Sequence, residues 1–292
     1  MSGARLTRKQ PTRSYARRRP THSAGYVGGA QSRRWFSGVL GLIGESMMTL
    51  GVLLGLFVVW ELWYTDIVGN RAQAEIVANL DWEDSALPIP VDIAGDSQGP
   101  AVYPVIPSEI TKRTDPPPVI AEPGEATTFA TLYVPRWGFD YVKPVSQGVS
   151  KRRVLNPLGI GHYPDTAMPG DQGNFSLAAH RNTYGKPFSD IDQLVEGDAI
   201  IVRTENVWYV YRVYRTKIVK PTYIEAIAPV PGYPLSEPNG RFITLTTCHP
   251  RYSAGERYIV HGELEYWAPA GSGYPTELIP EDQRAPSTEG TI

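Results

Sequence analysis

An apolar stretch over residues 35–64 constrains this chain more than any other feature of its sequence. Its only charged residues are Glu45 and Glu61, which are separated by fifteen uncharged residues and flanked by further apolar ones. A helix needs about 20 mostly apolar residues to cross the hydrocarbon core of a membrane. Aromatic residues cluster at the far end of the stretch, as is typical at headgroup depth. The stretch therefore predicts a transmembrane anchor helix over residues 36–64.

Charge is distributed very unevenly on the two sides of this stretch. Residues 1–35 carry nine Arg or Lys and no Asp or Glu, so the net charge of −2 leaves −11 on the remainder. A basic flank holds its end of the span in the cytoplasm. A cleaved signal peptide is disfavoured because the small-x-small site at 72–74 lies far beyond the apolar run. The sequence predicts a single-pass cell-membrane protein with a cytoplasmic tail over 1–35, an extracellular remainder and no nucleic-acid partner.

The extracellular part changes composition twice along its length. Residues 65–128 read as a helical continuation of the anchor followed, from about residue 85, by a Pro-rich stalk with polyproline character. Short β-like runs separated by Gly and Pro fill residues 129–268, which we interpret as the folded domain. Residues 269–292 are polar and read as a tail without a second apolar span.

Seven runs in the folded domain are rich in β-branched and aromatic residues and predict strands, at 129–137, 140–145, 173–181, 198–204, 207–220, 241–248 and 257–267. Glu205 and Asn206 separate two of them and predict a hairpin turn. Two short pieces, 151–158 and 187–195, look helical. Many closely spaced strands with little helix predict a mainly β fold, a closed barrel with short helices.

Cys248 is the only cysteine, which excludes an internal disulfide framework and a Cys-rich metal site. It ends the apolar run 241–248 and is followed by His249 and Pro250. A lone cysteine is most often a small buried side chain. An exported protein that keeps a free thiol risks oxidation, however, and a strand end at a barrel rim lets a reactive group reach solvent. Cys248 is therefore a candidate nucleophile.

A cysteine nucleophile needs a base or a positive partner, because a thiol with a pKa of about 8.5 is mostly protonated near neutrality. His22 lies in the cytoplasmic tail, and His249 is adjacent to Cys248 and points to the opposite face of the strand. Spacing does not choose among the three remaining histidines, His162, His180 and His261. Arg257 begins the next strand, and an antiparallel return would bring it near Cys248.

Three segments resemble the sortase family. Residues 244–264 read TLTTCHPRYSAGERYIVHGEL, which is similar to the sortase signature T-L-x-T-C with an Arg at the start of the next strand. Residues 161–192 resemble the segment that carries the sortase catalytic His, and the anchor ends in VVWELWYTD. Together they look most like the class E sortases of high-GC Gram-positive bacteria. The resemblance covers the membrane segment and residues 129–268.

This resemblance implies an eight-stranded β-barrel and a role for each matching residue. Cys248 matches the nucleophile, His180 the general acid/base and Arg257 the group that stabilises the oxyanion or the substrate carbonyl. Thr247 matches the signature threonine that helps shape the substrate site. His162 and His261 are then interpreted as structural or surface histidines.

The reaction that the resemblance implies is transpeptidation. The Cys248 thiolate attacks the Thr–Gly carbonyl of an LPXTG-like or LAXTG-like sorting signal on a secreted protein, and a primary amine from a peptidoglycan precursor of the lipid II type resolves the thioacyl intermediate. No cofactor and no metal are implied, because the acidic residues of 187–198 lack a calcium-ligand spacing. Cell-wall anchoring of secreted proteins is the expected function.

Two alternatives stay open. A pilin-polymerising sortase would use a pilin Lys as the acceptor, but the C-terminal tail is polar and the nearest match to an inhibitory Asp-Pro-aromatic lid is only Leu80-Asp81-Trp82. A catalytically silent, membrane-tethered β-barrel would serve as an adhesin or assembly factor. Such a protein would be expected to lack one of the three catalytic residues, all of which are present.

Overall fold

The computed structural model describes residues 30–82, 103–280 and 283. The chain forms two units with a boundary between Leu56 and Phe57. Most of the predicted cytoplasmic tail, the first part of the predicted stalk and the end of the C-terminal tail lie outside the described residues. The stretch Gly38–Ala78 is one helix, long and apolar enough by length and composition to cross a membrane, and it is the one such helix in the described ranges.

Helix α1 (Ala30–Ala78) contains the predicted span 36–64 and continues beyond it. The predicted helical continuation of the anchor is thus present as the last turns of α1. The helix contains no Pro, and its five glycines within residues 38–55 have no neighbouring atom where a Cβ would stand. The last part of α1, from Phe57 on, belongs to the second unit together with the barrel.

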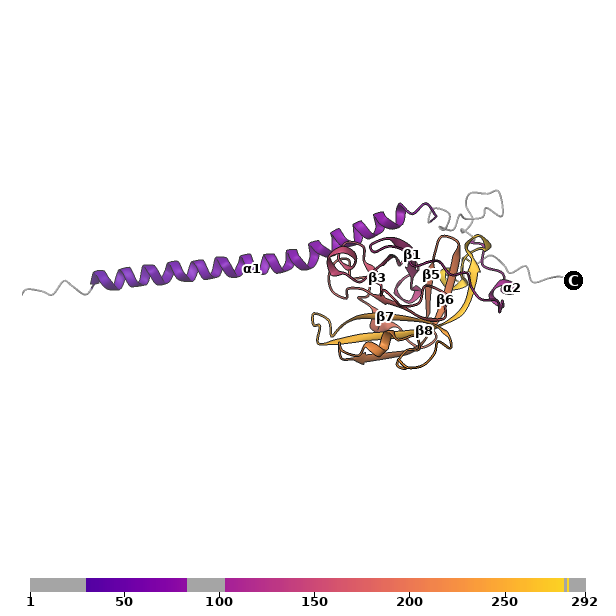
Figure 1. Ribbon diagram of the computed structural model, residues 1–292. Coiled ribbons are helices and arrows are strands. Elements are labelled where there is room, and N and C mark those ends of the chain that lie inside the picture. The colour runs from indigo at the N-terminus through magenta and orange to yellow at the C-terminus, as the bar shows by residue number, and fades with distance from the viewer. Residues whose placement is uncertain (1–29, 83–102, 281–282, 284–292) are drawn as a thin grey trace, which may run out of the picture. The chain divides into compact units, whose positions relative to one another are not determined.

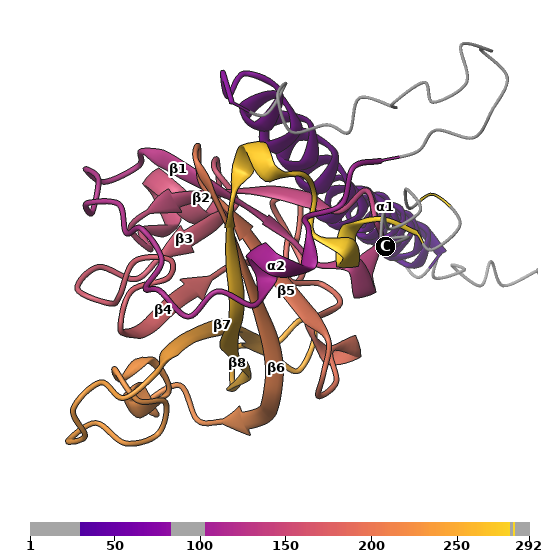
Figure 2. The ribbon, with the colours of Figure 1, turned by 90° about the vertical axis from the view of Figure 1, so that its right-hand side faces the viewer.

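Eight strands close into a barrel in the order β1-β2-β3-β4-β7-β8-β6-β5, with β5 pairing back to β1 (Figures 1 and 2). Their bounds are β1 Thr128–Tyr133, β2 Val142–Gln147, β3 Ile160–His162, β4 Gly173–Ala178, β5 Ala199–Arg203, β6 Val207–Val219, β7 Arg241–His249 and β8 Glu256–Pro269. Two pairs are parallel, β2 with β3 and β4 with β7, and the others are antiparallel. The predicted closed eight-stranded barrel is confirmed.

The strand pattern also explains why several strands are apolar on both faces. In β5, Ile200 and Val202 belong to the barrel core, whereas Ile201 belongs to a second cluster on the outer face. In β6, Tyr209 and Tyr211 face the core and Trp208 lies in the outer cluster. Successive side chains of a strand point to opposite faces. Both faces of this part of the barrel are therefore buried.

Segments before and after the barrel cover this outer cluster. Ile106 is buried in it, and helix α2 (Ser108–Thr111) lies against β8 (Figure 2). Tyr274 and Leu278 pack against it from the C-terminal side. Residues 103–127 and 269–280, which the sequence assigned to the end of a Pro-rich stalk and the start of a polar tail, thus contact the barrel. The apolar side chains of Trp208 and its neighbours on the outer face of the barrel give the physical reason, because without these segments they would form an apolar patch in contact with water.

The turn and the short helices predicted from the sequence are found in the structure, the helices as shorter elements. The hairpin turn at Glu205 and Asn206 joins β5 to β6. The predicted short helices are single turns, η2 (Lys151–Leu155) and η3 (Ile191–Gln193). Strand β3 was not predicted from the residues, because three residues are too short for a period-two pattern to be recognised.

Candidate active site

Cys248 and Arg257 occupy opposed positions on two adjacent strands. They are register partners in the antiparallel pair of β7 and β8. Directly opposed residues of such a pair place their side chains on the same face, with Cβ atoms about 5 Å apart. Both are partly exposed, and the thiol of Cys248 is free. The antiparallel return predicted from the sequence is confirmed, and the structure brings a guanidinium to the face of the thiol.

The Arg257 side chain is held by the loop between the two strands. Its Nη1 donates hydrogen bonds to the carbonyl oxygens of Ala254, at 3.0 Å, and Glu256, at 2.9 Å. A guanidinium has five N–H donors, so these two bonds leave donors for a further acceptor. The group can therefore stabilise a negative oxygen that develops near Cys248.

His180 lies at the level of Cys248 on the other side of β7. Strand β4 runs parallel to β7 with Leu177 opposite Leu245 and Ala178 opposite Thr246, and His180 follows two residues later. The Thr247 hydroxyl donates to the carbonyl oxygen of Ala179, at 2.7 Å, so the alignment continues past the end of β4. Cys248 and Arg257 thus come from the adjacent strands β7 and β8, and His180 comes from the segment that follows β4, the other neighbour of β7.

Three groups around His180 set the state of its imidazole. Nε2 lies 2.8 Å from Oδ1 of Asn156, and because an amide oxygen only accepts, Nε2 carries the proton and Nδ1 is left with a lone pair. The Tyr184 ring packs against the imidazole in a tilted arrangement, with centroids 5.2 Å apart and an interplanar angle of 36°. Burial, assisted by the positive charge of Lys151, lowers the pKa of His180 below its ordinary value of 6.5. The imidazole is therefore neutral near neutral pH and able to accept a proton.

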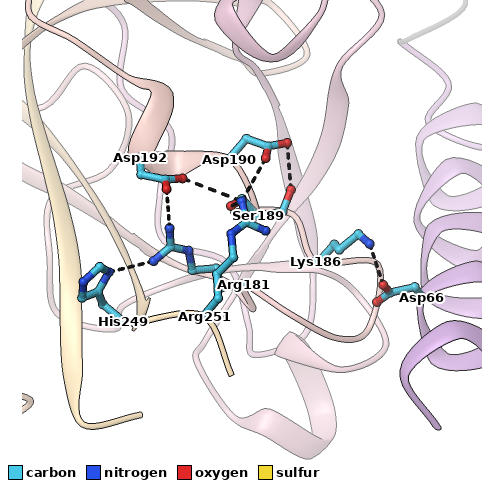
Figure 3. A network of polar contacts seen from close by, with 8 residues as sticks. All are labelled: Asp66, Arg181, Lys186, Ser189, Asp190, Asp192, His249 and Arg251. Carbon is cyan, nitrogen blue, oxygen red and sulfur yellow. Dashed lines mark hydrogen bonds and ion pairs between the residues drawn. The ribbon is translucent and has the colours of Figure 1, made fainter. Parts of the chain in front are cut away.

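Arg181, the residue after His180, joins the segment that carries His180 to the segment that carries Cys248 (Figure 3). It is 3% exposed, and its Nη1 donates to Nδ1 of His249 at 2.8 Å. Its Nη2 forms an ion pair with Asp192 at 2.9 Å. Because His249 directly follows Cys248, the arginine ties the end of β7 to the loop after β4. A buried cation that is paired in this way fixes the relative position of both segments.

Two acidic residues of the stretch 187–198, which was considered as a calcium site, are paired with arginines. Arg251 donates to the carbonyl oxygen of Ser189 and to a carboxylate oxygen of Asp190, the latter at 3.1 Å, and Asp192 pairs with Arg181 (Figure 3). Within residues 30–82, 103–280 and 283, no group of three or more His, Cys, Asp or Glu is placed to hold a metal ion.

The other two candidate histidines lie in the barrel wall. His162 is fully buried between Gln147 and Thr166, at 2.7 and 2.9 Å, and burial lowers its pKa to about 4. His261 is buried beside the Thr244 hydroxyl, at 2.9 Å, and burial together with nearby cations lowers its pKa to about 3. Both are interior residues with hydrogen-bond partners, which fits the structural role expected of them.

Asn156, Arg181 and Tyr184 take part in this site but were not singled out from the sequence. Asn156 is 24 residues before His180, and no motif or periodicity links the two. The positions of Arg181 and Tyr184 next to His180 were visible, yet their contacts depend on how the loop turns. A partner of this kind becomes apparent only when the strand register is known.

Removal of the Thr247 hydroxyl is expected to lower the stability of the fold. Thr247 is 4% exposed, and its bond to the Ala179 carbonyl links β7 to the segment before His180. We expect Thr247→Val to lower the free energy of unfolding by about 1–3 kcal/mol, because an isosteric methyl leaves that carbonyl without its donor. Thermal unfolding of the full chain in detergent micelles measures it. The control Thr247→Ser keeps the hydroxyl and should lose less; an equal loss in both variants would assign the effect to packing of the methyl group.

Comparisons with known proteins agree with this geometry. The sortase domain model matches residues 132–265. Sortases SrtE1 and SrtE2 of Streptomyces coelicolor are each 34% identical, over 245 and 238 residues, which is 81% and 76% of this chain. The matches span 60% of the length of SrtE1 and 81% of SrtE2. The solved SrtA sortase from Actinomyces oris is similar with a TM-score of 0.55 and 41% identity, covering 58% of this chain and 97% of that one.

Proposed function

The chain belongs to the sortase family, whose members are cysteine transpeptidases, and from this premise we propose that it is a membrane-anchored class E sortase. It cleaves an LAXTG-type or LPXTG-type sorting signal of a secreted protein between Thr and Gly and joins the protein to a cell-wall amine. The observation that carries the proposal is the pairing of Cys248 with Arg257 across β7 and β8, with His180 beside them on the neighbouring segment.

The first half-reaction forms a thioacyl enzyme. The neutral imidazole of His180 accepts the thiol proton, and the Cys248 sulfur attacks the carbonyl carbon of the Thr–Gly bond. The Arg257 guanidinium stabilises the negative charge that develops on the carbonyl oxygen. The carbon–nitrogen bond then breaks, and the proton held by His180 passes to the leaving amine of Gly.

The second half-reaction releases the enzyme. A primary amine, which we assign to a peptidoglycan precursor, attacks the thioester carbonyl and transfers a proton to His180. The new amide bond forms as the carbon–sulfur bond breaks, and the Cys248 sulfur recovers its proton. The catalytic residues are thus returned to their starting state. Thr247 supports the site from behind, because its hydroxyl binds the main chain next to His180.

We infer from α1 how the chain is placed in the membrane. Its apolar stretch fits a single membrane span, and the nine basic residues within 1–35 assign the N-terminus to the cytoplasm. The barrel then lies outside the cell, where secreted proteins with sorting signals and lipid-linked amines are found. This topology is part of the proposal.

A peptide assay tests the proposed function and its class. We expect the full chain in detergent micelles to cleave a quenched-fluorescent LAXTG peptide, and to cleave it faster than the matched LPXTG peptide, because class E enzymes prefer Ala at the second position. Adding a primary amine should convert the product from the free acid to the amide, as mass spectrometry would show. A chain inert toward both peptides that still binds a surface protein would favour the non-catalytic barrel, and amide formation only with a pilin Lys would favour a pilin-polymerising enzyme.

A further inference from the structure

One face of the last turns of α1 is buried against the barrel within the second unit. Asp66, Gly69 and Gln73 are the buried residues of this face. Spacings of three and four residues place them in a row on the helix. Gln73 is 0% exposed, which is uncommon for a long polar side chain. This face is therefore built to contact the barrel.

The contact brings helix backbone against loop backbone at Gly69. A Cβ added to Gly69 would lie 2.5 Å from the carbonyl carbon of Tyr184 and 2.6 Å from the main-chain nitrogen of Gly185, distances that a real Cβ does not tolerate. One turn earlier, Asp66 forms an ion pair with Lys186 at 2.9 Å (Figure 3). Only glycine allows the helix to approach the loop this closely.

The loop that the helix touches has a conformation that needs support. Tyr184, Gly185 and Lys186 all have positive φ, at 55°, 76° and 36°. For residues other than glycine such backbone costs on the order of 1–3 kcal/mol each and persists only where the surroundings enforce it. Nε2 of Gln73 donates to the Tyr184 carbonyl oxygen at 2.9 Å. The helix thus contacts each of the three residues of this turn.

The same glutamine reaches a second loop. A Cβ on Gly159 would lie 2.9 Å from the amide carbon of Gln73, so the amide is packed directly against Gly159. Gly159 lies three residues after Asn156, whose side chain accepts the hydrogen bond from His180. The ring of Tyr184, on the first loop, packs against the same imidazole. One helix side chain therefore contacts both loops that hold the ring.

We propose that residues 66–73 of α1 are a positioning element for His180, in addition to being part of the anchor. This inference rests on the proposed function, in which His180 transfers protons. Asp66, Gly69 and Gln73 touch no reacting atom and act through the two loops. A displacement of a catalytic group by about 1 Å lowers the rate by as much as about 100-fold. If residues 66–73 lost their contact with the two loops, the barrel would stay folded but the enzyme would turn over slowly.

Gly69→Ala tests the proposal with a single added methyl group. We expect kcat for sorting-peptide cleavage to fall about 10- to 100-fold at unchanged KM, because the methyl group separates helix and loop. Alanine has a higher helix propensity than glycine by about 1 kcal/mol, so the change stabilises the helix. A fall in kcat would therefore not result from a less stable helix. Gly44→Ala is the matched control, since a Cβ there meets nothing within 4 Å. Gln73→Ala, which removes the contact to both loops, should reproduce the loss.

A second readout does not depend on turnover. In the full chain in micelles, with His ring carbons labelled, we expect the NMR titration of His180 to move up toward 6.5 in Gly69→Ala, because a displaced loop buries the ring less, and to stay in place in Gly44→Ala. Lys151 is the charged group that acts on the ring, and Tyr184 is the titratable group whose ring lies beside it.

The outcomes separate this proposal from the proposed function. A normal kcat and an unmoved His180 titration in Gly69→Ala would overturn the positioning role. The positioning role would also be overturned if the activity of Gly69→Ala and Gln73→Ala fell only in proportion to their loss of folded protein. A wild-type chain that cleaves no sorting peptide would instead contradict the proposed function, and the His180 titration would still show whether the helix positions the ring.

Discussion

Cys248→Ala is expected to lower kcat for cleavage of the sorting peptide by about 10⁴-fold or more, to the background of the assay. The nucleophile forms the covalent intermediate, so its removal leaves no path for acyl transfer. Cys248 is at the partly exposed end of β7, and the change removes one sulfur atom from a position outside the buried core. The variant should therefore keep the thermal unfolding temperature of the wild type. Activity above about 1% of wild type in the purified variant would contradict the mechanism.

The lone cysteine also provides an independent check on the same residue. Because the chain has one Cys, alkylation by iodoacetamide modifies a single known site. We expect the reagent to inactivate the wild type, and the sorting peptide to slow the inactivation by occupying the thiol. Mass spectrometry of the wild type with the peptide and no amine acceptor should show the acyl group on Cys248. Cys248→Ser is the matched variant; its hydroxyl is far less acidic than the thiol and should remain nearly inactive.

The sequence predicted which residues face each other across β7 and β8, but it did not predict the residues that contact His180. The Cys248 and Arg257 pair followed from two strands joined by a short loop, because antiparallel neighbours must return alongside each other. His180 was one of three histidines that spacing left open, and only the resemblance selected it. The parallel pairing of β4 with β7 shows why: residues 68 positions apart, such as Ala178 and Thr246, become neighbours through a register that no local pattern encodes.

The limits of the folded region were harder to predict for a different reason. Proline-rich composition at 103–127 indicates extended backbone, but it does not say whether that backbone is free or packed. Trp208 and Tyr266 lie on the outer face of the barrel, and the apolar side chains of Ile106 and Tyr274 cover them. This burial depends on tertiary contacts between distant segments. The helix face at Asp66 was missed in the same way, since its partners are more than 100 residues away.

His180→Gln is expected to lower kcat about 10³-fold, which is the usual contribution of a general acid/base. Glutamine is close in length to histidine and keeps an amide near Asn156, but it does not accept a thiol proton or deliver one to the leaving amine. The Tyr184 ring and the Thr247 bond stay in place, so the fold should be preserved. Steady-state cleavage of the sorting peptide measures the loss, and Gly44→Ala, where a Cβ meets nothing within 4 Å, serves as the folded, active control.

The pH profile distinguishes loss of proton transfer from loss of structure. Burial and Lys151 lower the pKa of His180, so its neutral form, the one that accepts the thiol proton, persists below pH 6.5. In the wild type, kcat/KM should therefore rise with pH through a limb below 6.5, and this limb should vanish in His180→Gln. Lys151→Met removes a positive charge that disfavours the imidazolium, so it should move the limb to higher pH with little change in the maximal rate. A limb that survives in His180→Gln would assign the proton transfer to another group.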